Sequence, residues 1–361
     1  MNRFIFWGIF YALCTSFTGE IEACTGIKLI ARDGALVHGR TLEFGVPVDI
    51  TTAVIPRDYT FHSTTPSGPG LLYKSKYAAV GASAFGDPAL MDGLNEKGLA
   101  VGTFYFPTFA GYAQMTPENR TKALSPVGFA NWILTQFASV AEVKTALSQV
   151  VIVPTIGKGW GPAPPPFHYI VFDKMGECLV IEPLDGKLVT YENKLGVFTN
   201  SPNFQWHMTN LRNFINMSPF NMKPITWNGV KLESFGQGSG MVGIPGDFTP
   251  PSRFVRAAIF SVTAFPADNA NDAIFQLFHI LNQFDIPLGV AREKVGDMIY
   301  SDKTQLTCAR DPQALKYYFK SYDDQTIKVI DLKHFDLNAK TIKSLNITGA
   351  GKAYDISSQL K

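Results

Sequence analysis

The chain has 361 residues, a formal net charge of +2, 46% hydrophobic residues and 17% charged residues. This length is ample for a sizeable hydrophobic core. A charge so close to zero gives no case for a nucleic-acid partner or for binding to an anionic membrane surface.

The first 23 residues have the pattern of a secretory signal peptide. Arg3 supplies a positive start, residues 4–13 form an apolar run, and Ala23 is the small residue that signal peptidases prefer. The run is too short to span a bilayer, which takes ~20 apolar residues, and no second long run follows. We therefore expect a signal peptide over residues 1–23, one domain over residues 24–361, export to the periplasm or outside the cell, and no stable membrane anchor.

Cleavage after Ala23 would make Cys24 the first residue of the mature chain, with a thiol and a free α-amine on one residue. An α-amine titrates near pH ~7.7–8.0, so it can take the thiol's proton close to neutrality without a histidine. Residues 21–24, Ile-Glu-Ala-Cys, also fit a loose lipoprotein motif, in which Cys24 would be lipidated and its amine blocked. In that alternative the chain is a non-catalytic lipoprotein or ligand-binding module.

The other cysteines and the histidines give no sign of a metal site. After cleavage the chain would keep Cys24, Cys178 and Cys308, an odd number that indicates a free thiol. Whether Cys178 and Cys308 pair stays open. No Cys-x-x-Cys is present and the six histidines lack close metal-ligand spacing, so neither a metal nor another cofactor is expected.

Most of the chain has the pattern of short strands joined by turns. Asp33-Gly34 indicates a turn between two strands, and residues 92–103 predict a hairpin with Gly98 at a positive φ. Further strands are expected at residues 168–172, 178–182, 187–191 and 196–199. Helices are expected at residues 127–137, from the capping pair Ser139/Glu142 to about residue 150, and at residues 272–283. Strand runs interrupted by helices predict an α+β fold of stacked layers.

Six motifs occur in order along the chain: Cys-Thr-Gly at residues 24–26, Gly-Arg at 39–40, Asn-Glu-Lys-Gly-Leu at 95–99, Thr-Asn-Ser-Pro at 199–202, Gly-Gln-Gly-Ser-Gly at 236–240 and Pro-Gly-Asp-Phe-Thr-Pro-Pro-Ser-Arg-Phe at 245–254. Together they resemble the choloylglycine hydrolase family, the bile salt hydrolases and penicillin V acylases of the N-terminal nucleophile hydrolase superfamily. The resemblance extends from Cys24 to at least Leu281. It implies a four-layer αββα sandwich, hydrolysis of N-acyl amides by Cys24, and a homo-oligomer, usually a tetramer.

The resemblance also implies roles for individual side chains. Arg40 would lie against the Cys24 thiol, where its positive charge favours the thiolate. Glu43 stands where the family most often has Asp and would accept a hydrogen bond from the α-amine. Asn200 would donate its side-chain amide to the oxyanion, and Arg253 would lie near the reacting amide.

Tyr105 bears on the choice of substrate. By the same resemblance, bile salt hydrolases tend to carry Asn at this position and penicillin V acylases tend to carry Tyr. The backbone N–H of Tyr105 would complete the oxyanion hole with either side chain, and its ring would stack on a phenoxyacetyl group. We therefore expect small-molecule substrates of the penicillin V type, or N-acyl-homoserine lactones, with conjugated bile salts as the alternative.

Overall fold

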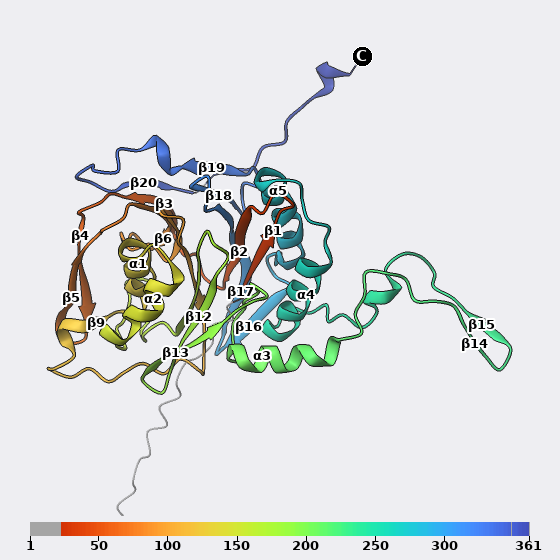
Figure 1. The fold of residues 1–361 in the computed structure, drawn as a ribbon, viewed down its shortest axis with the longest axis horizontal. Coiled ribbons are helices and arrows are strands. Elements are labelled where there is room, and N and C mark those ends of the chain that lie inside the picture. Colours follow the sequence, from red (N-terminus) through yellow and green to blue (C-terminus); the bar gives the residue numbers. More distant parts are fainter. Residues whose placement is uncertain (1–22, 348, 361) are drawn as a thin grey trace, which may run out of the picture.

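The computed structural model describes residues 23–347 and 349–360 (Figure 1). The predicted signal peptide lies outside the described residues, except for Ala23. Over these two ranges, no helix is both long enough and apolar enough to cross a bilayer.

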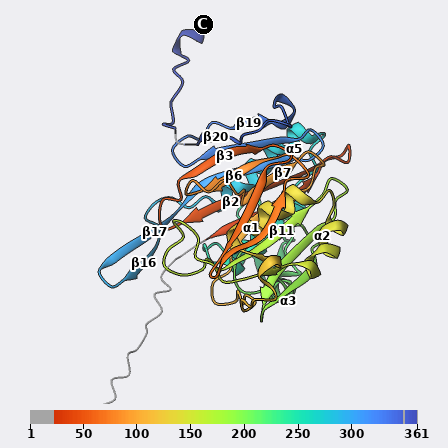
Figure 2. The same cartoon turned by 90° about the vertical axis from the view of Figure 1, so that its left-hand side faces the viewer.

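One sheet of six strands begins with the strand that carries Cys24. Its strands pair in the order β1-β2-β17-β18-β19, and β16 also pairs with β17. The turn between β1 and β2 contains Asp33-Gly34, with Gly34 at a φ of 85°, as predicted. Figure 2 shows the hairpin of β16 and β17 projecting from the body. The strands are β1 (Cys24–Ile30), β2 (Leu36–Phe44), β16 (Ala291–Val295), β17 (Met298–Asp311), β18 (Lys316–Ser321) and β19 (Lys328–Asp331).

A second sheet of eight strands has the order β13-β12-β11-β8-β7-β6-β3-β20. The predicted hairpin is present as β7 and β8, and Gly98 has a φ of 83°. Its strands are β3 (Ile50–Ile55), β6 (Ala79–Ala84), β7 (Asp92–Asn95), β8 (Ala100–Tyr105), β11 (Phe167–Phe172), β12 (Cys178–Leu184), β13 (Lys187–Glu192) and β20 (Lys343–Asn346). Two short pairs accompany the sheets: β4 (Thr60–Thr65) with β5 (Gly68–Lys74), and β9 (Ala123–Leu124) with β10 (Val151–Ile152).

The strand predicted at residues 196–199 is wrong. Only Phe198 pairs, through two backbone hydrogen bonds to Gly26 of 2.7 and 3.0 Å. A turn from Asn193 to Gly196 precedes it, and the Cys24 N–H, which would continue the pairing, donates to the Asn200 side chain and not to its carbonyl, so no ladder forms.

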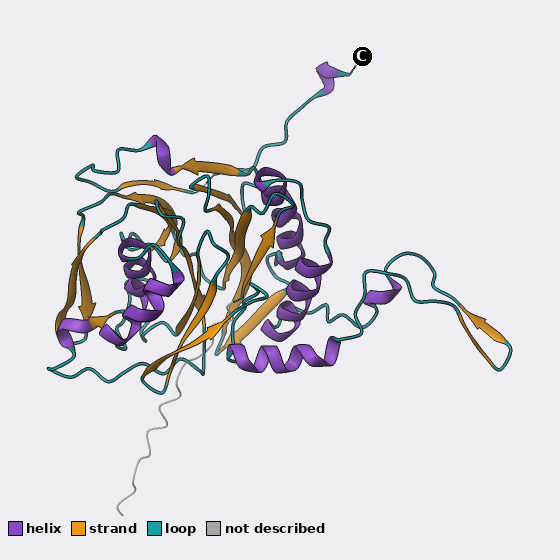
Figure 3. Cartoon of the chain, viewed as in Figure 1, coloured by secondary structure: helices purple, strands orange, loops and turns teal. Residues whose placement is uncertain are grey.

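Helices cover the outer face of each sheet, which gives the four-layer αββα sandwich that the resemblance implies (Figures 1 and 3). Helix α1 packs on β7, β8 and β11 of the eight-stranded sheet, and α4 and α5 pack on β1, β2 and β17 of the other. The helix at residues 250–263 was not predicted, although Pro250 is at its first position, where proline is favoured. The helices are α1 (Pro126–Gln136), α2 (Val140–Ala146), α3 (Phe204–Leu211), α4 (Pro250–Thr263) and α5 (Ala270–Leu281).

The two sheets approach closely at the start of β1. A Cβ at Gly26 would lie 2.9 Å from the ring of Phe104 on β8, so any larger residue would push the sheets apart. The Phe104 ring contacts that of Phe198, with 5.0 Å between their centroids. This packing brings the first residues of β1 against β8 and against the segment around residue 200.

Residues 215–245, here called the arm, extend away from the sandwich beyond α3 and α4 (Figure 1). The arm contains a short hairpin of β14 (Ile225–Trp227) and β15 (Val230–Leu232). Asn228 and Gly229 both have a positive φ, which is the pattern of a two-residue type I′ turn. This Asn-Gly pair between apolar residues is a hairpin signal in the sequence, and the hairpin was not predicted.

Candidate active site

Cys24 is the first residue of β1, and its side chain is buried between the sheets. Its partner in the register is Leu42 of β2, so Arg40, two residues away, faces the same side of the sheet. The Arg40 Nη2 donates to the Cys24 Sγ over 2.6 Å. The structure therefore places the predicted arginine directly on the predicted nucleophile.

Backbone carbonyls and an aromatic ring fix the Arg40 side chain. Its Nη1 donates to the Thr103 carbonyl over 2.5 Å and its Nε to the Thr41 carbonyl over 3.1 Å. The guanidinium carbon lies 4.1 Å from the centroid of Phe104. Burial raises the pKa of the Cys24 thiol, and the positive charge of Arg40 acts against that rise. The effect of Arg40 thus has the predicted sign, but burial outweighs it.

A buried carboxylate behind Arg40 was missed by the sequence analysis. Asp92, at the start of β7, lies 3.7 Å from the Arg40 Nη1 and forms a closer ion pair with Arg310 of β17. Its other oxygen, Oδ1, accepts hydrogen bonds from the Cys308 thiol and the Tyr317 hydroxyl, at 3.2 and 3.1 Å. Asp92 precedes the Asn-Glu-Lys-Gly-Leu motif by three residues, but nothing local to it indicates that two arginines converge there.

The three cysteines of the described chain are all buried free thiols. Cys178 is on β12 of the eight-stranded sheet and Cys308 on β17 of the six-stranded sheet. The question that the sequence left open is therefore answered: these two residues do not pair.

Asn200 and Arg253 meet at the backbone of Cys24. The Cys24 backbone N–H donates to the Asn200 Oδ1 over 2.7 Å. Arg253, on α4, donates through Nη2 to the same oxygen over 2.8 Å, and through Nη1 to the Cys24 carbonyl over 2.5 Å and to the Thr25 hydroxyl over 2.8 Å. The Asn200 carbonyl in turn bonds the His207 Nε2 over 2.8 Å. Through these contacts, Arg253 of α4 fixes the backbone at the start of β1.

Tyr105 ends β8 beside Asn200. Its backbone carbonyl accepts a hydrogen bond from the Asn200 Nδ2 over 2.8 Å. An amide nitrogen carries two N–H groups, so this bond occupies one of the two that Asn200 has to donate. The half-buried Tyr105 ring lies edge-on to Phe44 and Phe167, with centroids 6.4 and 6.3 Å apart.

Glu43 lies opposite the residue that precedes Cys24. Its backbone N–H donates to the Ala23 carbonyl over 2.9 Å, and its Oε1 accepts from the Thr304 hydroxyl over 3.0 Å. Burial raises the pKa of the Glu43 carboxyl to about 7, although the charge of Arg253 acts in the opposite direction. In the chain that retains Ala23, the Cys24 nitrogen bonds Asn200, and a contact of Glu43 with a free α-amine stays a prediction.

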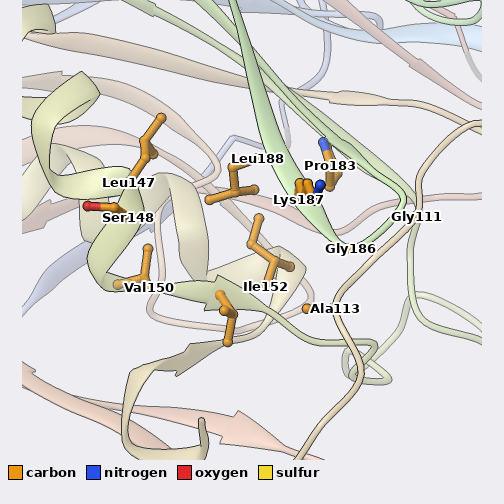
Figure 4. Close-up of a pocket in the computed structure, with 11 residues that line it drawn as sticks. Gly111, Ala113, Leu147, Ser148, Val150, Ile152, Pro183, Gly186, Lys187 and Leu188 are labelled. Atoms are coloured by element: carbon orange, nitrogen blue, oxygen red, sulfur yellow. The ribbon is translucent and has the colours of Figure 1, made fainter.

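Five of the six predicted side chains therefore lie at the beginning of β1, and Tyr105 joins them through its backbone carbonyl. A separate cavity of about 300 Å³ lies near the end of α2 and the turn between β12 and β13 (Figure 4). None of the six lines it, and its lining is mainly apolar, with Lys187 and Ser148 as the two polar side chains. It carries no nucleophile paired with a base, so the hydrogen-bonded group around Cys24 is the candidate active site.

Comparison with known proteins supports this assignment. The sequence model of the family described as linear amide C–N hydrolases, choloylglycine hydrolase family, matches residues 24–345. A bile salt hydrolase/transferase from Clostridium perfringens is 33% identical over 326 residues, which is 89% of this chain and 96% of the relative. A penicillin V acylase from Pectobacterium atrosepticum is 28% identical and covers 73% of this chain and 68% of its own length.

A solved structure agrees with the sequence comparisons. The crystal structure of a variant of the conjugated bile acid hydrolase from Clostridium perfringens superposes with a TM-score of 0.82 at 29% identity, over 92% of this chain and all of the other. This chain belongs to the choloylglycine hydrolase family of linear amide C–N hydrolases.

Proposed function

We propose that this amide hydrolase uses Cys24 as its nucleophile and that its substrates are conjugated bile salts. The main evidence for Cys24 as the nucleophile is the hydrogen bond of 2.6 Å from the Arg40 Nη2 to the Cys24 Sγ. A buried cation at that distance stabilises a thiolate, the reactive form of cysteine. The substrate class rests on the names of the relatives that match most of the chain.

The reaction starts from a chain in which Cys24 is the first residue. The α-amine takes the thiol proton, and the sulfur attacks the amide carbonyl to form a tetrahedral intermediate. The second N–H of the Asn200 amide and the backbone N–H of Tyr105 donate to the oxyanion. The α-ammonium then gives its proton to the leaving amine as the C–N bond breaks, and water hydrolyses the resulting thioester to return the thiol.

Two observations point to different substrates, and we give more weight to the relatives. Tyr105 favours penicillin V-type amides by resemblance, as expected from the sequence. The named bile salt hydrolase from Clostridium perfringens nevertheless matches 89% of the chain, against 73% for the penicillin V acylase, and is the more identical of the two. One side chain is weaker evidence than similarity along the whole fold, so penicillin V and N-acyl-homoserine lactones become the second candidates.

The test compares kcat/KM for a glycine-conjugated bile salt and for penicillin V on one preparation of the processed chain. We expect the bile salt to be preferred, and Tyr105→Asn to change the ratio without abolishing activity. A large preference for penicillin V would overturn the substrate proposal and leave the nucleophile intact. Cys24→Ser should lose nearly all activity on both substrates, and full activity of that variant would refute the nucleophile.

Export and processing are tested by the mass of the purified chain. We propose that residues 1–23 are removed on export, because Cys24 has a free α-amine only then. A chain that begins at Cys24 with no added mass would support this. A diacylglycerol on Cys24 would instead support the lipoprotein alternative and exclude the α-amine as base.

We also propose that the chain forms a homo-oligomer through the arm. Large apolar side chains of the arm are exposed, including Trp227 at 66% and Phe220 at 78%. The arm is too narrow to bury them within one chain. Light scattering after size-exclusion chromatography should give a multiple of the chain mass, and Trp227→Asp together with Phe220→Asp should lower it. A monomeric wild type would refute the proposal.

A further inference from the structure

Two buried carboxyl groups behind Cys24 have oxygens without partners. Among the described residues, both oxygens of Asp302 and the Oε2 of Glu43 are buried and lack a hydrogen-bond partner. Each residue is only 1% exposed. An unpartnered buried carboxyl is costly, so three such oxygens together call for a donor or a cation.

The strand register places these carboxyls next to the future N-terminus. Ala23 lies opposite Glu43, and Glu43 pairs with Thr304 of β17. Asp302 precedes Thr304 by two residues, so both side chains leave β17 on the same face. The Thr304 hydroxyl already bonds Glu43, at 3.0 Å. When Ala23 is removed, the α-nitrogen of Cys24 becomes the end of β1 beside this pair.

The groups that act on Asp302 come from three neighbouring elements. They are Glu43 of β2, Arg253 of α4 and Glu293 of β16. Burial first, and then the negative charge of Glu43, raise the pKa of Asp302 to about 8, while Arg253 acts to lower it. In the chain that retains Ala23, these two carboxyls therefore share Arg253, while Arg40 also acts on Glu43.

A count of the buried charges shows what Asp302 contributes to the balance of the site. Three arginines near Cys24, and three carboxylates, are each at most 1% exposed: Arg40, Arg253, Arg310, Glu43, Asp92 and Asp302. A processed Cys24 with a thiolate and an α-ammonium adds one charge of each sign. With Glu43 and Asp92 ionised, the site is neutral only if Asp302 is ionised too, both before and after processing. Because the new α-ammonium lies at the Glu43 end of β1, its positive charge favours the ionised form of Asp302.

We propose that Asp302 is a positioning residue that, together with Glu43, balances the α-ammonium of processed Cys24 and so sets the pH range in which the thiolate–ammonium pair exists. This inference rests on the proposed function, because it takes Cys24 as the first residue. Asp302 gives up its proton when Ala23 leaves, and its carboxylate then faces the new α-ammonium. Its charge acts on that group from the helix side of the sheet, opposite to Arg40.

The first test is the pH dependence of Cys24 alkylation by iodoacetamide, followed by mass spectrometry, in processed wild type and in Asp302→Asn. Loss of a negative charge lowers the pKa of a nearby ammonium and of the thiol, so both the alkylation curve and the kcat/KM profile should move to lower pH by about one unit. Glu293→Gln is the matched control: it removes a partly buried carboxylate near Asp302 and should leave both curves in place. An unchanged Asp302→Asn curve, or a shift to higher pH, would overturn the proposal.

The alkylation readout needs no substrate, so it separates this inference from the proposed function. A chain that hydrolyses neither amide but shows the shifted alkylation curve would refute the substrate and keep the role of Asp302. If Asp302→Asn does not fold, wild type labelled with ¹³C at aspartate carboxyls decides by NMR. One buried carboxyl should titrate near pH 8 in the unprocessed chain and well below neutrality in the processed chain, and identical titrations would refute the proposal.

Discussion

Asp92→Asn should destabilise the protein far more than an ordinary surface change does. The substitution keeps the shape of the side chain and removes the charge that Arg40 and Arg310 share. Arg40 keeps the Thr103 and Thr41 carbonyls and the Phe104 ring. Arg310 is left worse off, because its Nε has no partner among the described residues and its Nη2 keeps only a 3.7 Å contact to the Cys308 sulfur.

The expected magnitude follows from this uncompensated charge. Breaking a buried ion pair by removing one partner costs roughly 3–5 kcal/mol. For a chain of this size that corresponds to a fall in Tm of about 4–7 °C. Urea unfolding monitored by circular dichroism measures the free energy of unfolding directly. A linear amide assay on the same sample shows whether activity falls along with stability.

A matched control makes the result specific. Asp268→Asn is the same change in an ion pair with Arg32 of 2.9 Å whose side chains are 73% and 64% exposed. Exposed pairs contribute about 0–1 kcal/mol, so this variant should be close to wild type. If the stability of Asp92→Asn falls within about 1 kcal/mol of that of Asp268→Asn, the charge of Asp92 does not stabilise the fold.

Three further predictions concern the site. Asn200→Ala should lower kcat by about 10²–10³ with a smaller change in KM, because it removes an oxyanion donor. A variant with an unchanged kcat and a KM raised by that factor would contradict the role. In the unprocessed chain the folded pKa of Glu43 is about 7, above the ordinary 4.5, so its contribution to stability is present below pH 4.5 and is lost as the pH rises through 7. In Glu43→Gln, the free energy of unfolding measured with urea should fall less between about pH 5 and pH 8 than in wild type. The same pH dependence in both proteins would contradict the prediction. Thiol titration of the unfolded, processed chain should give three equivalents, since Cys24, Cys178 and Cys308 are free, and one equivalent would indicate a disulfide.

Local sequence pattern predicted much of the layered fold, whereas the residues of the candidate site were predicted only through family resemblance. Turns were the most reliable feature, because Gly34 and Gly98 occupy backbone conformations that other residues avoid. Cys24 and the five other predicted site residues were found through family resemblance, not through spacing. Their contacts join residues up to 229 positions apart, and local pattern has no access to such distances.

What the sequence did not predict depends on packing between distant strands. Asp92 and Asp302 look like ordinary acidic residues in the sequence, yet both are at most 1% exposed and lie in the charge cluster. Their importance comes from the pairing of β2 with β17, which no local pattern encodes. Helix α4 was missed because its start was interpreted only as a family motif, and the segment at residues 196–199 has strand composition but a single pairing partner.

The position of β17 has a consequence for the order of events during synthesis. β2 lies between β1 and β17 in its sheet, so the outer edge of β2 stays unpaired until residues 298–311 have been synthesised. At ~5–20 residues per second, the ribosome needs roughly 15–50 s to make the chain between Phe44 and Asp311. An apolar hairpin with an open edge during that interval invites wrong pairing. Binding by a chaperone or rapid translocation of the unfolded chain would protect it until the C-terminal strands arrive.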